Sequence, residues 1–157
     1  MLIRLLMLDG LKVGEVIRTD ASDFHGRPPR MTLDVTSRSA PTLVLHADTA
    51  AAVRSYLRAR REGPLLLSER RGQAAQRLTR FGADYVIKHV AQAAGVAGPV
   101  SGNTLRRRFV IAAHARGTDL EAIRHNAGHS GQRTTRRYLT GEDDAHPKRR
   151  PSRQPSE

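Results

Sequence analysis

Residues 103–138 concentrate the side chains that could do chemistry: arginines, a Gly-His pair and one tyrosine. Arg106, Arg107 and Arg108 precede an apolar run, so they fall in the first turns of a helix that we expect to begin near Thr104. Positive side chains oppose the helix dipole there, unless an anion shares the site. A helix N-terminus that carries several guanidinium groups is typical of a phosphate-binding site.

Two further helices are expected in this stretch. Thr118 and Glu121 have capping-box spacing, which predicts that a short helix begins there. A turn at residues 127–130 separates it from a third helix, which begins near Gln132. Three arginines of this third helix lie on adjoining faces: Arg133, Arg136 and Arg137. The basic segment therefore lies between the histidine and the tyrosine of the stretch.

Each of these signals has an ordinary structural explanation when it is taken alone. Three adjacent arginines form a solvated surface about as often as they form a site. A tyrosine near a helix end usually belongs to the rim of a hydrophobic core. The order of the signals along the chain is more specific than any one of them.

In that order, the signals resemble the second half of a tyrosine recombinase catalytic domain of the phage-integrase type. In that family the run reads roughly His-x-x-Arg, then Leu-Gly-His, then Thr-Thr-x-x-Tyr. The matching residues here are Arg106, Gly128-His129 and Thr134-Thr135-Arg136-Arg137-Tyr138. Asn103 stands at the first His position, and Ala127 stands at Leu.

The first half of the chain departs from the family pattern at two places. The family's Thr-Gly-Leu-Arg-x-x-Glu corresponds to residues 9–15, where Lys12 replaces the first catalytic arginine and loses its bidentate fork. The family presents a lysine general acid at a hairpin tip, but residues 31–45 contain no lysine. Arg38 is the only cation near that tip, and an arginine is a poor proton donor near neutral pH.

The resemblance implies site-specific DNA recombination or integration, in which DNA is cut and rejoined without a metal, nucleotide or other cofactor. Tyr138 would attack the scissile phosphate and form a phosphotyrosyl intermediate. Arg106 and Lys12 would neutralise the non-bridging oxygens, His129 would donate a hydrogen bond, and Asn103 would orient the phosphate. The arginines that we expect to contact DNA are Arg38, Arg107, Arg108, Arg133, Arg136 and Arg137. The expected partners are double-stranded DNA and further recombinase subunits bound to it, with no small-molecule substrate.

Two other classes of protein stay open. A catalytically weakened, recombinase-like DNA-binding protein would keep the basic face, and Lys12, Asn103 and the missing hairpin lysine favour it. An unrelated RNA-binding protein is the other alternative. The sequence holds only three Phe and three Tyr for base stacking, which argues against single-strand binding.

The fold implied is mainly helical (α+β), a recombinase-like catalytic domain over residues 1–140 with a small antiparallel β-hairpin sheet. It would lack the family's first helix and N-terminal DNA-clamping domain. Periodicity predicts helices over residues 2–8, 11–17, 48–60 and 79–94, and strands over residues 31–35 and 42–45 joined by a turn at 37–41. Residues 25–30 and 70–77 are expected to be loops, and residues 141–157 a disordered charged tail.

The net charge of +12 lies within the expected domain. Residues 141–157 hold four Lys or Arg and four Asp or Glu, so the whole excess falls in residues 1–140. Because the excess charge lies on the folded domain and not on a tail, it favours a shaped nucleic-acid site. A membrane surface is a weaker explanation, because the sequence has no basic amphipathic helix with a bulky aromatic face.

The sequence has no cysteine, no metal-ligand spacing, and no apolar run long enough for a signal peptide or membrane span. We therefore expect a cytoplasmic protein with no metal site, in which His89 and His114 lie at the edge of the core.

Overall fold

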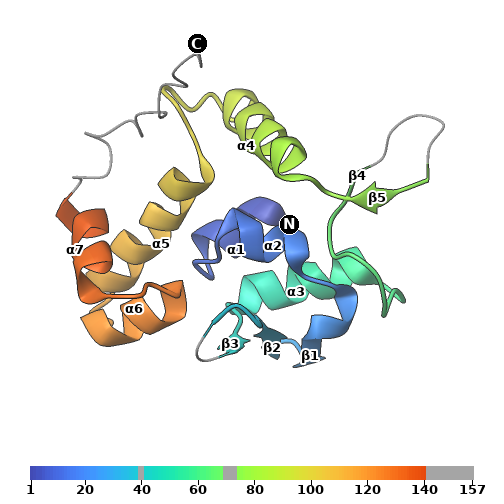
Figure 1. Cartoon of the computed structure of the whole chain (residues 1–157), viewed down its shortest axis with the longest axis horizontal. Coiled ribbons are helices and arrows are strands. Elements are labelled where there is room, and N and C mark those ends of the chain that lie inside the picture. The colour runs from blue at the N-terminus through green and yellow to red at the C-terminus, as the bar shows by residue number, and fades with distance from the viewer. Residues whose placement is uncertain (39–40, 69–73, 141–157) are drawn as a thin grey trace, which may run out of the picture.

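The computed structural model describes residues 1–38, 41–68 and 74–140, and the expected tail and the middle of the 37–41 turn lie outside them. Figure 1 shows helices packed around a central helix pair, with a small sheet on one side. The elements are α1 Leu2–Met7, α2 Val13–Arg18, a 3₁₀ turn Ala21–Asp23, β1 Phe24–Arg27, β2 Arg30–Asp34, β3 Thr42–Val44, α3 Ala47–Leu57, β4 Leu67–Ser68, β5 Gln76–Arg77, α4 Arg80–Ala93, α5 Gly102–Ala115, α6 Leu120–Ala127 and α7 Gln132–Thr140.

The main sheet is antiparallel, with strand order β1-β2-β3. Leu33 in the middle strand pairs with Phe24 on one side and Leu43 on the other, and its side chain is fully buried. The expected pairing of β2 with β3 is confirmed. The prediction of a loop over residues 25–30 is wrong at its start, because Phe24–Arg27 pairs with β2 as a third strand.

A second, two-stranded antiparallel sheet is formed by β4 and β5, which precede α4 in the chain. Leu67 and Ser68 pair with Arg77 and Gln76, respectively, so the loop predicted over residues 70–77 is wrong at its end. Residues 69–73 lie outside the described part of the chain.

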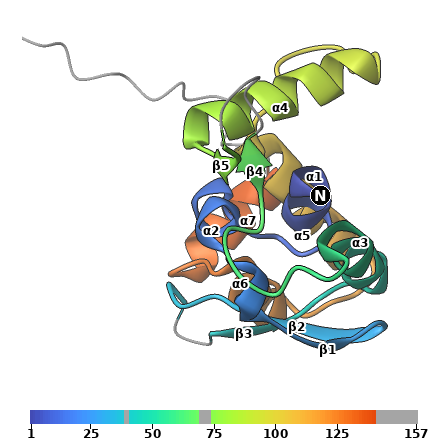
Figure 2. The ribbon, with the colours of Figure 1, turned by 90° about the vertical axis from the view of Figure 1, so that its right-hand side faces the viewer.

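The buried residues form two hydrophobic clusters that meet along α5. The first cluster contains the inward faces of α1, α2, the main sheet, α3 and α4, and it includes Leu105 of α5. The second cluster is built by α5, α6 and α7 from Phe109, Val110, Ala113, Ile123, Ala127 and Tyr138. In Figures 1 and 2 α5 lies beside α1, and in Figure 1 α6 and α7 lie on the far side of α5, so α5 joins the two clusters.

Helix ends follow local capping chemistry. The Ser101 side chain accepts a hydrogen bond from the Thr104 amide, which starts α5 earlier than expected. The predicted Thr118 cap is wrong: Asp119 accepts from the amides of Glu121 and Ala122 instead. A carboxylate there also complements the helix dipole. The expected start of α7 at Gln132 is confirmed.

Several sequence expectations need correction at the surface. α3 ends at Leu57 rather than near residue 60. The helical spacing of Ala83, Val86, Ile87, Val90 and Ala94 predicts that all five face the core from α4, but only Ala83 and Ile87 are buried and Val90 is 42% exposed. His89 and His114 are both exposed, so they do not lie at the core edge. Among the described residues, no helix is long and apolar enough to cross a membrane. Within the same part of the chain, no three or more His, Cys, Asp or Glu side chains form a group that could hold a metal ion.

Candidate active site

A cleft of about 430 Å³ lies where the N-terminal end of α2, the β2–β3 hairpin and the three C-terminal helices meet. Its lining is basic, and its basic or aromatic side chains are Lys12, Arg38, Arg106, Arg124, His125, His129 and Tyr138. No carboxylate is found among the described residues that line it. Such a cleft attracts anions, because low-dielectric walls lined by one sign of charge focus the field.

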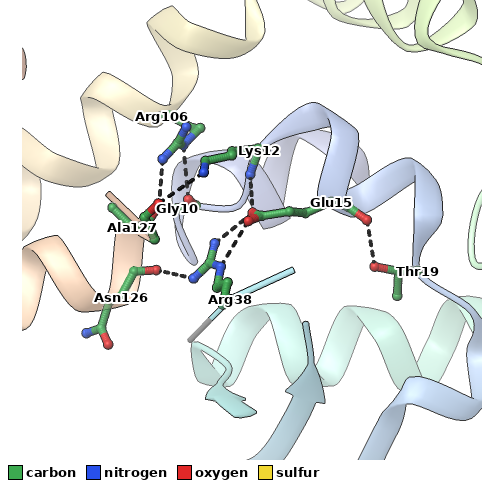
Figure 3. Close-up of polar contacts among 9 residues, drawn as sticks. Gly10, Lys12, Glu15, Thr19, Arg38, Arg106, Asn126 and Ala127 are labelled. Carbon is green, nitrogen blue, oxygen red and sulfur yellow. Dashed lines mark hydrogen bonds and ion pairs between the residues drawn. The ribbon is translucent and has the colours of Figure 1, made fainter. Parts of the chain in front are cut away.

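Three of these cations converge on the C-terminal end of α6 (Figure 3). The last carbonyls of a helix lack intrahelical partners and carry the negative end of its dipole. Asn126 O accepts from Arg38 Nη1 at 2.5 Å, Ala127 O accepts from Arg106 Nη2 at 2.6 Å, and Gly128 O accepts from Lys12 Nζ at 3.0 Å. The end of α6 therefore holds cations from three distant segments side by side.

Arg106 is the most deeply fixed of the three, with 5% of its surface exposed. Its Nε donates to Gly10 O at 3.1 Å. Gly10 has φ +67°, and a Cβ there would lie 2.5 Å from the Phe109 ring, so this acceptor loop needs glycine. Burial lowers the pKa of Arg106, opposed by the Tyr138 hydroxyl and by Glu15. An arginine nevertheless keeps its proton near neutral pH, so the buried charge persists.

Arg38 reaches the cleft from the hairpin and forms a buried ion pair with Glu15. Arg38 Nε lies 3.1 Å from Glu15 Oε1, and Nη2 lies 2.7 Å from Oε2. The side chains are 5% and 2% exposed. Burial alone would raise the pKa of Glu15, but hydrogen bonds and charge from Arg38 and Lys12 hold it below its ordinary value. The hairpin is thereby tied to α2.

His129 lies in the turn after α6 and is 6% exposed. Its Nδ1 lies 2.9 Å from Thr135 Oγ1, whereas its Nε2 is buried and has no hydrogen-bond partner among the described residues. Burial, reinforced by Arg106 and the neighbouring cations, lowers the pKa of His129 to about 4. The imidazole is therefore neutral at pH 7 and carries one proton.

Tyr138 packs into the second hydrophobic cluster and is 6% exposed. Its ring stacks on His129, with centroids 5.0 Å apart and planes 3° from parallel. The Arg106 guanidinium carbon lies 6.0 Å from the ring centroid. Arg107 Nε donates to the Tyr138 carbonyl at 2.9 Å and so links α5 to α7. The tyrosine is held beside the cations by three separate contacts.

The sequence model of the phage integrase family matches residues 1–144, which is most of the chain. The chain belongs to the phage integrase family. The fold is similar to that of XerA recombinase, with 20% identity and a TM-score of 0.72 over 92% of this chain and 56% of that chain. It is also similar to XerH recombinase in a pre-cleavage complex with its difH substrate, with 20% identity and a TM-score of 0.69 over 92% and 43%.

A third similar structure is the Tn1549 transposon integrase in complex with a circular intermediate DNA. Identity is 14%, and the TM-score is 0.59 over 92% of this chain and 57% of that chain. The chain therefore spans only about half the length of the recombinases that it matches. No curated protein matches it significantly.

Four of the five predicted catalytic residues, Lys12, Arg106, His129 and Tyr138, line one cleft. Their catalytic roles stay a prediction. Asn103 does not line this cleft. This exposed side chain lines an adjacent cleft of about 450 Å³, which shares Lys12 and Arg106 with the first. The orienting role of Asn103 stays a prediction.

Of the arginines expected to contact DNA, only Arg38 lines the cleft, and there it is bound to Glu15 and Asn126. The others lie on α5 and α7 outside it: Arg108, Arg133 and Arg136 are exposed, and Arg107 and Arg137 are half-buried. Their contact with DNA stays a prediction.

Sequence reasoning missed Arg124. Its Nη1 donates to His129 O at 3.0 Å, and its Nε donates to Glu121 Oε1 at 2.7 Å. The sequence signal for the position of Arg124 is Gly128, which ends α6 in the left-handed conformation with φ +61°. The His129 amide then returns to the Arg124 carbonyl at 3.0 Å, a closure that a C-terminal glycine often produces. The role of Glu15 as partner of Arg38 was also missed.

Proposed function

We propose that this chain is the catalytic part of a site-specific DNA recombinase, with residues 1–140 as the catalytic unit. Its substrate is double-stranded DNA, which it cuts and rejoins through a phosphotyrosyl intermediate while further copies occupy the same DNA. The observation that carries the proposal is the placement of the buried Tyr138 ring against His129 and Arg106, in a cleft where no described lining residue is a carboxylate.

The chemistry begins with Tyr138. Its phenol oxygen attacks the scissile phosphorus, and the bond from phosphorus to one deoxyribose oxygen breaks. The phenol loses its proton, and the leaving oxygen gains one as a hydroxyl. The new phosphotyrosyl bond keeps the energy of the old one, so a second deoxyribose hydroxyl reverses the step and rejoins the strand.

The cations stabilise charge on the phosphate during this step. Arg106 is preorganised by two carbonyl acceptors, so it needs little rearrangement as charge develops. Lys12 is exposed and adds a mobile point charge. Arg38 adds a third cation whose movement is restrained by Glu15. Residues 31–45 supply no lysine to protonate the leaving oxygen, and Arg38 is a poor proton donor, which predicts a slow reaction.

A DNA-binding protein without cleavage activity is the second candidate. It is favoured by one observation, that Arg38, the only cation of the sequence near the hairpin tip, is locked in a buried ion pair. An arginine held in this way supplies charge without a transferable proton. The two candidates share the DNA partner and differ only in covalent chemistry.

The test is incubation of the protein with a pool of nicked duplexes of randomised sequence, followed by denaturing electrophoresis. A nick next to the cut lets a short fragment diffuse away, so the covalent intermediate accumulates. We expect a denaturant-resistant protein–DNA adduct from the wild type and none from Tyr138→Phe. Tyr85→Phe, which alters an exposed tyrosine on α4, should give as much adduct as the wild type.

Binding to the same duplexes separates the two candidate functions. Tyr138→Phe should fold and bind DNA as the wild type does, because only the hydroxyl is removed. Wild-type protein that binds the duplexes tightly yet never forms an adduct would favour the DNA-binding candidate.

A further inference from the structure

The hydroxyl of Thr135 contacts His129, and packing alone does not explain why a hydroxyl is present at this position. Thr135 lies in the second turn of α7 and is fully buried. Its Oγ1 has a single partner among the described residues, His129 Nδ1 at 2.9 Å. Valine has nearly the same shape, so packing alone would not select a hydroxyl here. A buried hydroxyl that meets one ring nitrogen can instead decide where the ring proton resides.

Two arrangements of the protons are compatible with this contact. In one, His129 Nδ1–H donates to Thr135, and Nε2 presents a lone pair. In the other, the Thr135 hydroxyl donates to Nδ1, and the ring proton sits on Nε2. The difference matters at Nε2, which has no partner within the described part of the chain and belongs to a side chain that lines the cleft.

An anion in the cleft selects between these arrangements. With the proton on Nε2, both donors are satisfied, because Thr135 donates to Nδ1 and Nε2–H donates to an anion oxygen. With the proton on Nδ1, the Thr135 hydroxyl hydrogen is left buried without an acceptor, and the Nε2 lone pair faces the anion. A buried unpaired donor is costly, and a lone pair repels an anion.

We propose that Thr135 is a positioning residue that directs the single proton of His129 to Nε2, where it donates to a phosphate oxygen bound in the cleft. Thr135 does not touch the phosphate and acts only through the imidazole. The stacking of His129 on Tyr138 fixes the ring plane, so the direction of this donor is set along with its proton. The inference rests on the proposed phosphate-binding function of the same cleft.

The test uses nitrogen-15 NMR of histidine-labelled protein with inorganic phosphate as the probe. The His129 resonances are assigned by their loss in His129→Gln. With saturating phosphate at pH 7, we expect Nε2 to show the protonated, pyrrole-type shift and Nδ1 the unprotonated, pyridine-type shift. Thr135→Val should populate both tautomers and weaken phosphate binding roughly tenfold or more, the loss of one well-directed donor to a charged group.

Two variants separate positioning from packing. Thr135→Ser keeps the hydroxyl and should retain both the tautomer and the phosphate affinity. Thr49→Val removes a different fully buried hydroxyl, on α3, and should change neither. If Thr135→Val fails to fold, the wild-type tautomer and the serine variant still decide the matter.

Three results would overturn the inference: a wild-type His129 protonated on Nδ1 with phosphate bound, a Thr135→Val protein that binds phosphate as the wild type does, or a wild type that binds no phosphate. The experiment is independent of strand cleavage. A wild type that shows the expected tautomer yet forms no adduct with nicked DNA would support the inference and refute the proposed cleavage.

Discussion

The buried pair of Arg38 and Glu15 offers the sharpest quantitative prediction. Glu15→Gln keeps the shape of the side chain and removes its charge, which leaves a guanidinium that is 5% exposed without its counter-ion. Arg38→Met keeps most of the apolar stem and leaves the carboxylate, 2% exposed, without its bidentate partner. Each single change therefore strands one buried charge.

The expected cost follows from the geometry. Breaking a buried ion pair by removing one partner typically destabilises a protein by about 3–5 kcal/mol. Arg38 retains its bond to Asn126 O, and Glu15 retains its bond from the Lys12 amide at 2.7 Å, so we expect values near the lower limit, about 3 kcal/mol. The double variant strands no charge and should be no less stable than either single variant.

Urea denaturation of the wild type, the two single variants and the double variant measures these free energies and their coupling. The pKa of Glu15 is held below its ordinary value of 4.5, so the pair stabilises the fold above that pH. That contribution is lost as the pH falls through the lower, folded-state pKa. The difference between wild type and Glu15→Gln should therefore shrink in acid. Additive single and double variants, or a difference independent of pH, would refute this account of the pair.

Three further predictions concern other parts of the molecule. Burial raises the pKa of Asp9 from 3.8 to about 6, although the hydrogen bond from the His46 amide opposes the shift. The fold is therefore destabilised as the pH rises from about 3.8 to about 6, because the buried carboxyl ionises less readily than the unfolded one. Asp9→Asn should then gain up to about 3 kcal/mol over the wild type at pH 7 and little at pH 4, measured by thermal unfolding. Lys12→Arg should raise the rate of adduct formation roughly tenfold, through one additional charge-assisted hydrogen bond; an unchanged rate would count against this placement of Lys12. Removal of residues 141–157 should leave duplex affinity and its steep salt dependence nearly unchanged, because that segment adds no net charge; a large loss of affinity would show that the folded face is not the DNA surface.

Most of the helices and the β2–β3 hairpin could be predicted, because their apolar periodicity is strong and local. The first strand was missed because Phe24–Arg27 contains a glycine and is followed by two prolines, which are turn signals in the absence of a partner strand. The sequence did not distinguish the cap of α6 because Thr118 and Asp119 are neighbours and both are residue types that cap helices; in the structure Asp119 accepts the helix amides.

The site itself was predictable only as a set of residues. Family resemblance brought Lys12, Arg106, His129 and Tyr138 together, and the structure places all four in one cleft. The acceptors that hold the cations could not be predicted, because they are backbone carbonyls at the end of α6. A carbonyl has no sequence signature, and its partners lie far along the chain: Arg106 is 21 residues from Ala127, Arg38 is 88 from Asn126 and Lys12 is 116 from Gly128.

The most direct test of the central claim is the mass of the tryptic peptide that contains Tyr138, recovered from protein that has reacted with nicked duplex DNA and been treated with nuclease. Cleavage after Arg137 and Lys148 gives a peptide of residues 138–148, which contains a single tyrosine. The proposed function predicts that this peptide carries a covalently attached nucleotide on Tyr138. An unmodified peptide 138–148 from an adduct-forming sample, with the nucleotide found on Tyr56 or Tyr85 instead, would contradict it.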